Sequence, residues 1–320
     1  MKPQGLVLWH DAMLKYSFPN KIFTSDKYQA FIQQVRQRNP GVDIHQVSQK
    51  VEWAVLEDTI SKAHLKVLTE MSETGKGFLD PITPAFKDML TPARFMIQAT
   101  YDAYLAVLRG DYPFAINVAG GLHHATPNQS MGGCILNDVA LAIAKLRKNG
   151  FKEKIAILDL DYHPHNGTVE HLMGDPTTFK ASIHEAGWFD FDDGFTGIEP
   201  GFGNVLSIGL KKPIDCNEYL AILEKKIFPP MSSFQPDLLV VLNGVDPHIE
   251  DSVVKNYPPP RKLAFSDEDF RKIIGTLIKF SWDMNKGKMV VLGAGGYDLQ
   301  STTKIWYQTL CQLTEHFKNF

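Results

Sequence analysis

Cysteines, long apolar runs and an excess of charge are all scarce in this sequence. The 320 residues include three cysteines, too few and too scattered for a disulfide framework or a Cys-x-x-Cys zinc site. No apolar stretch approaches the roughly 18 residues that span a bilayer. The N-terminal apolar run is cut by His10 and Asp11, so it lacks a signal-peptide core. The formal net charge of -3 supplies no overall basic field for nucleic acid. We therefore expect a cytoplasmic protein that binds neither membranes nor nucleic acid.

Repeats, low-complexity tracts and long linkers are also absent, so nothing indicates a second domain. Apolar runs of strand length alternate with segments of helix length, which is the pattern of a parallel sheet covered by helices on both faces. The sequence predicts one α/β domain over residues 1–320, with a doubly wound, mostly parallel sheet. The predicted strands are LVLWH, FAINVAGG, KIAILDLD, FKASIHE, NVLSIGL, PDLLVVLNGVD and KMVVLGAGG.

Two predicted helices are marked by their ends. The segment ILNDVALAIAKLRKNG has apolar residues at helical spacing, and Gly150 is its expected C-cap. In SDEDFRKIIGTLIKFSWDMN, Ser266 and Asp269 stand at the spacing of a capping box, with Asp a weaker partner than Glu or Gln. We expect a helix to begin directly after Ser266.

Acidic and imidazole side chains follow the predicted strand in ILDLDYHPHNGT. Side chains alternate between the two faces of a strand, so Asp159, Asp161 and His163 share one face. Further polar clusters, NVAGGLHHATP, NGVDPHIED and GAGGYD, follow three other predicted strands. Ligands of parallel α/β sheets bind beyond the carboxyl ends of the strands, where these four clusters would converge.

Each of these residues also has an ordinary structural interpretation. A strand-end Asp is usually a helix N-cap or turn residue, and Asp246 and His248 could simply terminate a strand. The convergence of four strand ends favours a catalytic metal site instead. Two carboxylates and a neutral imidazole suit Zn²⁺ with an open position for water, and the tandem His123 and His124 supply bases beside that water.

Five motifs, GGLHHA, GGCILNDVA, DLDYHPHNGT, NGVDPH and LGAGGYD, occur in the order and at roughly the spacing known from one family. Through them the sequence resembles the histone deacetylase superfamily, which includes acetoin-utilisation proteins and acetylpolyamine amidohydrolases. The similarity extends from about Pro81 to Trp306 and is weaker before that. The resemblance implies the arginase/deacetylase fold, a parallel sheet of about eight strands, and zinc-dependent hydrolysis of an acyl amide.

The resemblance also implies two kinds of cation site. Asp161, His163 and Asp246 match the ligands of the catalytic metal, Zn²⁺ or, in vivo, Fe²⁺. Asp159 and Ser182 match positions that line a structural site for K⁺ or Na⁺, mostly through backbone carbonyls.

Five residues match the groups that move protons or stabilise charge. His124 is the candidate general base and later general acid, next to His123. Asp159 would accept a hydrogen bond from His123, and Asn166 from His124. A charged partner raises the basicity of an imidazole more than a neutral one, so the pKa values of the two histidines should differ. Tyr297 matches the tyrosine that donates a hydrogen bond to the developing oxyanion.

The resemblance places Gly133, Phe189 and Gly295 in the substrate channel. Gly133 stands where many relatives have a phenylalanine, which predicts a wider entrance unless Met131 or Trp188 fills the gap. The expected substrate is an acylated lysine or another small acylated amine, and the sequence favours neither.

Four further residues depart from the family pattern or match it only loosely. Pro164 and His165 replace a His-Gly pair, and Lys27 stands near the place of an arginine beneath the site. Asp80 is a candidate for the aspartate of the rim.

Two alternatives to an active zinc amidohydrolase stay open. One is a catalytically weak module that uses the same pocket to recognise an acyl amide or a metal, although Tyr297 and Asp246 are both present. The other is an arginase-like site with two manganese ions. That site would need carboxylates where this chain has His165 and Asn166.

Overall fold

A sheet of eight parallel strands forms the centre of the computed structural model, which describes residues 4–19, 23–187, 204–256 and 261–318. The strand order is β2-β1-β5-β10-β9-β6-β7-β8. The prediction of a parallel sheet of about eight strands is confirmed, although β2 was not foreseen. The strands are β1 (Leu6–Trp9), β2 (Asp43–Gln46), β5 (Phe114–Asn117), β6 (Ile155–Asp159), β7 (Thr178–Glu185), β8 (Val205–Leu210), β9 (Leu238–Leu242) and β10 (Met289–Leu292).

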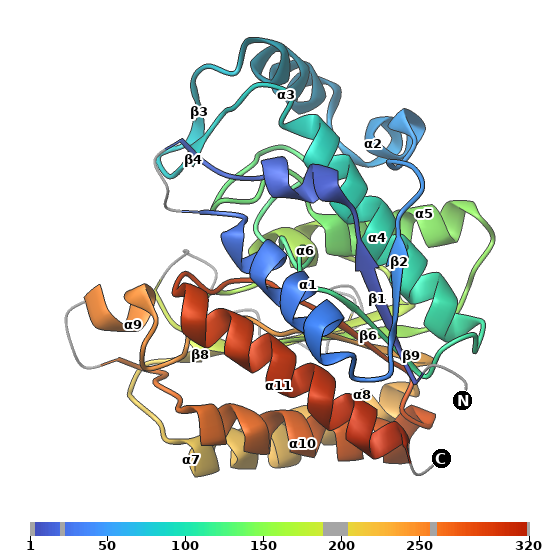
Figure 1. Cartoon of the computed structure of the whole chain (residues 1–320), viewed down its shortest axis with the longest axis vertical. Coiled ribbons are helices and arrows are strands. Elements are labelled where there is room, and N and C mark those ends of the chain that lie inside the picture. Colours follow the sequence, from blue (N-terminus) through green and yellow to red (C-terminus); the bar gives the residue numbers. More distant parts are fainter. Residues whose placement is uncertain (1–3, 20–22, 188–203, 257–260, 319–320) are drawn as a thin grey trace.

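Helices flank this sheet in two main groups, and a short antiparallel hairpin, β3 (Phe78–Asp80) and β4 (Thr83–Pro84), lies outside it. Helices α1, α11 and α10 lie side by side, and α4 packs on α5 and against β1 and β5 (Figure 1). The helices are α1 (Asp26–Arg38), α2 (Trp53–Thr59), α3 (Lys62–Thr74), α4 (Leu90–Leu108), α5 (Asp138–Lys148), α6 (Asn166–His171), α7 (Cys216–Ile222), α8 (Phe228–Phe234), α9 (Ser252–Asn256), α10 (Asp267–Asn285) and α11 (Leu299–Phe317), with a 3₁₀ turn at Asp11–Lys15 and a π turn at Leu223–Ile227.

The central strands are buried along their whole length. Every residue of β5, β6, β9 and β10 is buried, and these strands read as near-continuous apolar runs. That is the composition expected of parallel strands covered by helices on both faces. In the described part of the chain, no helix has both the length and the apolar character needed to cross a membrane.

The four strands that lead into the polar motifs are neighbours in this sheet, in the order β5-β10-β9-β6. Because all four run in the same direction, their carboxyl ends meet at one edge. His123 and His124 follow β5, Tyr297 follows β10, Asp246 follows β9 and Asp161 follows β6. The fold thus brings together residues that are far apart in the sequence.

The helix ends agree with the sequence patterns, with one shift. Ser266 and Asp269 form the predicted capping box of α10, each side chain bonded to the backbone N–H of the other. The C-cap of α5 is Asn149, and the predicted Gly150 follows it with a φ of 86°. Glycine is favoured at that position because a left-handed backbone costs it no steric strain.

We predict that Ser266→Ala lowers the free energy of unfolding by about 1 kcal/mol. The N-cap hydroxyl accepts a hydrogen bond from the N–H of Asp269, and water would replace that bond less well. Urea denaturation would measure the change. Ser233→Ala is the matched control, since that exposed hydroxyl bonds only to Pro229 within its own helix, and we expect a change within about 0.5 kcal/mol. Equal losses in the two variants would show that the cap contributes nothing specific.

Candidate active site

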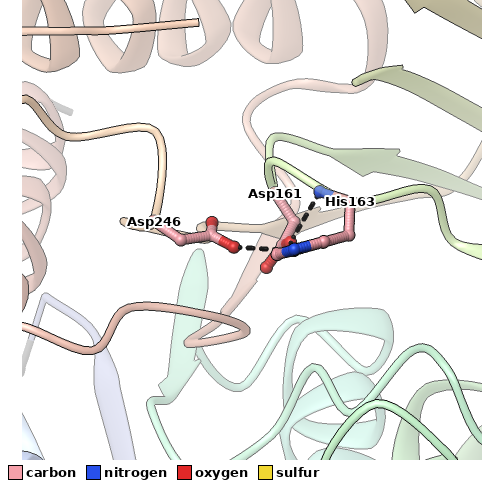
Figure 2. A group of neighbouring side chains, drawn as sticks. All are labelled: Asp161, His163 and Asp246. Carbon is pink, nitrogen blue, oxygen red and sulfur yellow. Dashed lines mark hydrogen bonds and ion pairs between the residues drawn. The ribbon is translucent and has the colours of Figure 1, made fainter. Parts of the chain in front are cut away.

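Two buried carboxylates and one imidazole meet where β6 and β9 end. Nδ1 of His163 lies 3.0 Å from Oδ1 of Asp161 and 3.0 Å from Oδ2 of Asp246, so the three predicted ligands converge on one point (Figure 2). Their ligand atoms all lie within 4.8 Å of one another. The backbone supports this arrangement, because the N–H of Tyr162 donates to Asp246 and the N–H of Gly295 donates to Asp161.

Electrostatics make this point attractive to a cation. Burial and repulsion from Asp161 raise the pKa of Asp246 to about 8. Burial disfavours a charge on His163, but its hydrogen bonds to Asp161 and Asp246 raise its pKa to about 10. The carboxylates therefore favour positive charge in the space between them, and a divalent ion brings a larger positive charge than a proton does. Two carboxylate oxygens and one imidazole nitrogen fit the donor preferences of such an ion.

The tandem histidines lie beside this cluster with different partners. Nδ1 of His123 is 2.7 Å from Oδ2 of Asp159, and Nδ1 of His124 is 2.7 Å from Oδ1 of Asn166. Their Nε2 atoms are 3.1 Å apart, and His123 is 3.8 Å from Asp161. The structure thus brings together all four residues of the predicted proton-transfer group.

The charges of the two imidazoles follow from these partners. Burial opposes protonation of His123, but Asp159 and Asp161 raise its pKa to about 9. Burial, with the charges of His123 and His163, holds the pKa of His124 well below its usual range. When the Nδ1 proton of His124 is donated to Oδ1 of Asn166, Nε2 is the unprotonated ring nitrogen, 3.1 Å from Nε2 of His123. The predicted difference in pKa between the two histidines is present in the structure.

Tyr297 is held on the loop after β10. Its backbone N–H donates to Oδ2 of Asp251 at 2.6 Å, and its ring meets that of Phe23 edge to face, with centroids 6.4 Å apart. Burial and the charges of Asp246 and Asp161 raise the pKa of its hydroxyl well above the usual value. The phenol therefore keeps its proton and can act as a hydrogen-bond donor.

Gly295 lies against the carboxylates. A Cβ atom there would come 2.5 Å from Oδ2 of Asp161 and 2.7 Å from Oδ2 of Asp246, so a side chain would displace both. Its place in the substrate channel stays a prediction, while its contact with the cluster is direct.

Two aromatic rings of the N-terminal segment lie beside Gly133. A Cβ added at Gly133 would lie 3.7 Å from Phe18 and 3.8 Å from Phe23, whereas Met131 makes its contact with Asn166. The sequence had not suggested these two neighbours, and the width of the entrance stays a prediction. The φ of Gly133 is 78°, so a larger residue there would also be strained. Phe189 and Trp188 lie outside the described residues.

Asp159 and Ser182 are direct partners across β6 and β7 and are both fully buried. The hydroxyl of Ser182 lies 2.9 Å from Nδ1 of His184. This pairing keeps the two backbones close together, as a shared cation site would require, and the predicted K⁺ or Na⁺ site stays a prediction.

Three of the four residues that depart from the family pattern or match it only loosely make hydrogen bonds in the structure. His165 has a φ of -83°, so the loop needs no glycine there, and its Nε2 lies 3.1 Å from Oγ of Ser207. Nζ of Lys27 donates to the carbonyl of Gly296 at 2.7 Å. Asp80 accepts a hydrogen bond from the N–H of Gly132 at 2.6 Å, which places it close to His124 in the fold.

Sequence reasoning missed two carboxylates that orient the catalytic loops. Asp138 accepts hydrogen bonds from the N–H groups of Gly121 and Leu122, directly before the tandem histidines. Asp251 accepts from the N–H of Tyr297. Both were visible inside quoted motifs, GGCILNDVA and NGVDPHIED, but only the fold reveals their partners.

Three comparisons relate this chain to known proteins. The profile of the histone deacetylase domain matches residues 22–313. An uncharacterized protein of Synechocystis sp. is 32% identical over 251 residues, 78% of each chain. The acetoin utilization protein AcuC of Staphylococcus xylosus is 29% identical over 197 residues, 60% of this chain and 49% of that protein. AcuC of Staphylococcus aureus MW2 is 26% identical over 246 residues, 76% of this chain and 61% of that protein.

The alignments therefore span about half to three fifths of the length of these two AcuC proteins. The crystal structure of the HDA15 HD domain superimposes with a TM-score of 0.80 at 19% identity, over 96% of this chain and 88% of that chain. At that identity the likeness shows the fold, which is the predicted arginase/deacetylase fold. Since the domain profile covers most of the sequence, the chain belongs to the histone deacetylase family.

Proposed function

We propose that this protein is a metal-dependent amidohydrolase that removes an acyl group, in the first instance acetyl, from lysine or another small amine. Family membership supports deacetylase-type hydrolysis. The observation that carries the proposal is the buried cluster of Asp161, His163 and Asp246 with a proton acceptor on His124 beside it. We assign Zn²⁺ to the cluster, with Fe²⁺ as the alternative in vivo.

The residues around the cluster divide the reaction between them. Bound Zn²⁺ would polarise the acyl carbonyl and acidify a water molecule. Nε2 of His124 takes the proton of the attacking water, since its Nδ1 proton is committed to Asn166. The hydroxyl of Tyr297 donates to the oxyanion that develops on attack. His124 then returns the proton to the leaving amine, and the products are a carboxylate and a free amine.

His123 has a supporting role in this scheme. Its contacts with Asp159 and Asp161 favour the imidazolium, which cannot accept a further proton. The charge on His123 also keeps His124 neutral before the reaction. A site with two manganese ions is disfavoured, because His165 contacts Ser207 and Asn166 contacts His124, so neither position offers a carboxylate.

We predict that Asp246→Ala lowers both the metal content and the hydrolysis of acetyl-lysine peptides and acetylpolyamines, because one of three protein ligands is lost. Elemental analysis and amine release would be measured together. Asp237→Ala is the matched control, since that exposed carboxylate precedes β9 and Asp246 follows it. Full metal occupancy in Asp246→Ala would remove this residue from the ligand set. A loaded wild-type protein that cleaves no acyl amide would refute the proposed function.

We predict that Tyr297→Phe keeps the metal while kcat falls by about a hundredfold or more, the size expected for one lost oxyanion donor. KM should change little, because the hydrogen bond forms only as charge develops. Tyr307→Phe on α11 is the matched control and should leave kcat unchanged. If Tyr297→Phe retains full kcat, another group must donate to the oxyanion.

We predict that His124→Ala costs more in kcat than His123→Ala. Nε2 of His124 is the unprotonated nitrogen of a neutral ring, whereas Nε2 of His123 carries a proton that it donates toward His124. The expected loss for the general base is about 10²- to 10⁴-fold. Steady-state kinetics at equal metal content would compare the two variants, and the reverse order would assign the base to His123.

A further inference from the structure

One peptide group, the one joining Gly296 to Tyr297, is held between two charged side chains. Nζ of Lys27 donates to its carbonyl oxygen at 2.7 Å, and Oδ2 of Asp251 accepts from its N–H at 2.6 Å. The cation therefore lies at the negative end of the peptide dipole and the anion at the positive end. Charge-assisted hydrogen bonds are about twice as strong as neutral ones. We call this pair and the peptide between them the loop clamp.

The two side chains of the loop clamp come from separate elements and are deeply buried. Lys27 lies in the first turn of α1 and is 4% exposed, with its ammonium 4.3 Å from the ring centroid of Phe23 and 5.6 Å from that of Tyr297. Asp251 is fully buried directly before α9 and also accepts from the N–H of Asp298 at 3.0 Å. Two distant segments are thus attached to the loop that carries the tyrosine.

The peptide of the loop clamp has a different support from the residue before it. Gly295 is held by its N–H bond to Asp161 and by its carbonyl, which accepts from the N–H of Val245. The 296–297 peptide is bonded to Lys27 and Asp251. Gly295 and Gly296 precede the tyrosine, and Ala294 and Gly296 have φ values of 52° and 131°. Glycine adopts many backbone conformations, so the orientation of this peptide must be set by outside contacts. Burying Lys27 and Asp251 is costly unless each is paired, and the peptide gives each of them a partner.

We propose that Lys27 and Asp251 are positioning residues that fix the 296–297 peptide and thereby aim the hydroxyl of Tyr297. Neither residue needs to touch the substrate for this role. The consequence for the rate rests on the proposed amide hydrolysis, whereas the clamp itself can be observed without any reaction.

The kinetic test is a pair of double-mutant cycles with Tyr297→Phe. Lys27→Met and Asp251→Asn should each lower kcat by about ten- to hundredfold, since small misplacements of a catalytic group cost that much. Metal content and KM should stay close to the wild-type values. Asp251→Asn removes the negative charge and turns an amide NH₂ either toward the N–H groups of Tyr297 and Asp298 or toward that of Val253, so it weakens the clamp without a change of size. In Tyr297→Phe protein neither substitution should lower kcat further, because the group that they position is gone.

Two variants control for folding and for loss of a buried charge. Lys27→Arg keeps the cation and its donors and should retain most of kcat. Lys145→Met is the matched control, since Lys145 is also buried, bonds to Gln98 at 2.6 Å, and lies 4.5 Å from the ring centroid of Tyr101. It should lower stability as Lys27→Met does but leave kcat unchanged. Losses that simply add to that of Tyr297→Phe would overturn the proposal.

A direct readout uses 3-fluorotyrosine placed only at position 297 and observed by ¹⁹F NMR. Wild-type protein, Lys27→Arg and Lys145→Met should give one resonance at the same shift. Lys27→Met and Asp251→Asn should give a shifted, broadened or split resonance. An unchanged resonance in both clamp variants overturns the proposal even if amide hydrolysis is established. A changed resonance supports it even if wild-type protein cleaves no amide, so the two failures are distinguishable.

Discussion

The buried pair of carboxylates, Asp161 and Asp246, is the constraint on which the rest of the site depends. Two carboxyl groups at this depth can ionise together only if positive charge or N–H donors surround them. His163 lies between them at 3.0 Å from each, and backbone N–H groups approach from the loops after β6 and β10. Gly295 allows one of these loops to come that close. The same charge concentration raises the pKa of Tyr297 and attracts a divalent cation.

This constraint also explains why the chain uses two adjacent histidines for different purposes. His123 contacts Asp159 and lies near Asp161, so its surroundings favour a charged ring. His124 contacts the neutral Asn166 and faces the charge on His123, so its surroundings favour a neutral ring. The two histidines thus differ in protonation state because one contacts a carboxylate and the other an amide. The order of the two in the sequence carries no such information by itself.

The sequence predicted those parts of the site that depend on local periodicity. The alternation of Asp159, Asp161 and His163 along one strand, and the rule that parallel strands end at one edge, located two of the three ligands, while Asp246 was assigned through the family resemblance. Contacts between distant segments could not be predicted in this way. Lys27 and Gly296 are 269 residues apart, and although the resemblance put Lys27 near the site, no local pattern paired it with Gly296. The aromatic rings beside Gly133 are a second contact of this kind, because a glycine in the sequence does not say which distant residues lie beside it.

Phe23 connects two features that look independent in the sequence. It lies 3.8 Å from the position that a Cβ at Gly133 would occupy, and its ring contacts both the ammonium of Lys27 and the ring of Tyr297. A residue larger than glycine at position 133 would need a strained backbone, and its side chain would grow toward Phe18 and Phe23. Glycine at position 133 is therefore favoured by the backbone conformation, since a Cβ there would meet both rings at ordinary contact distance. Phe23 links this turn to the catalytic loop, because its ring contacts both Lys27 and Tyr297.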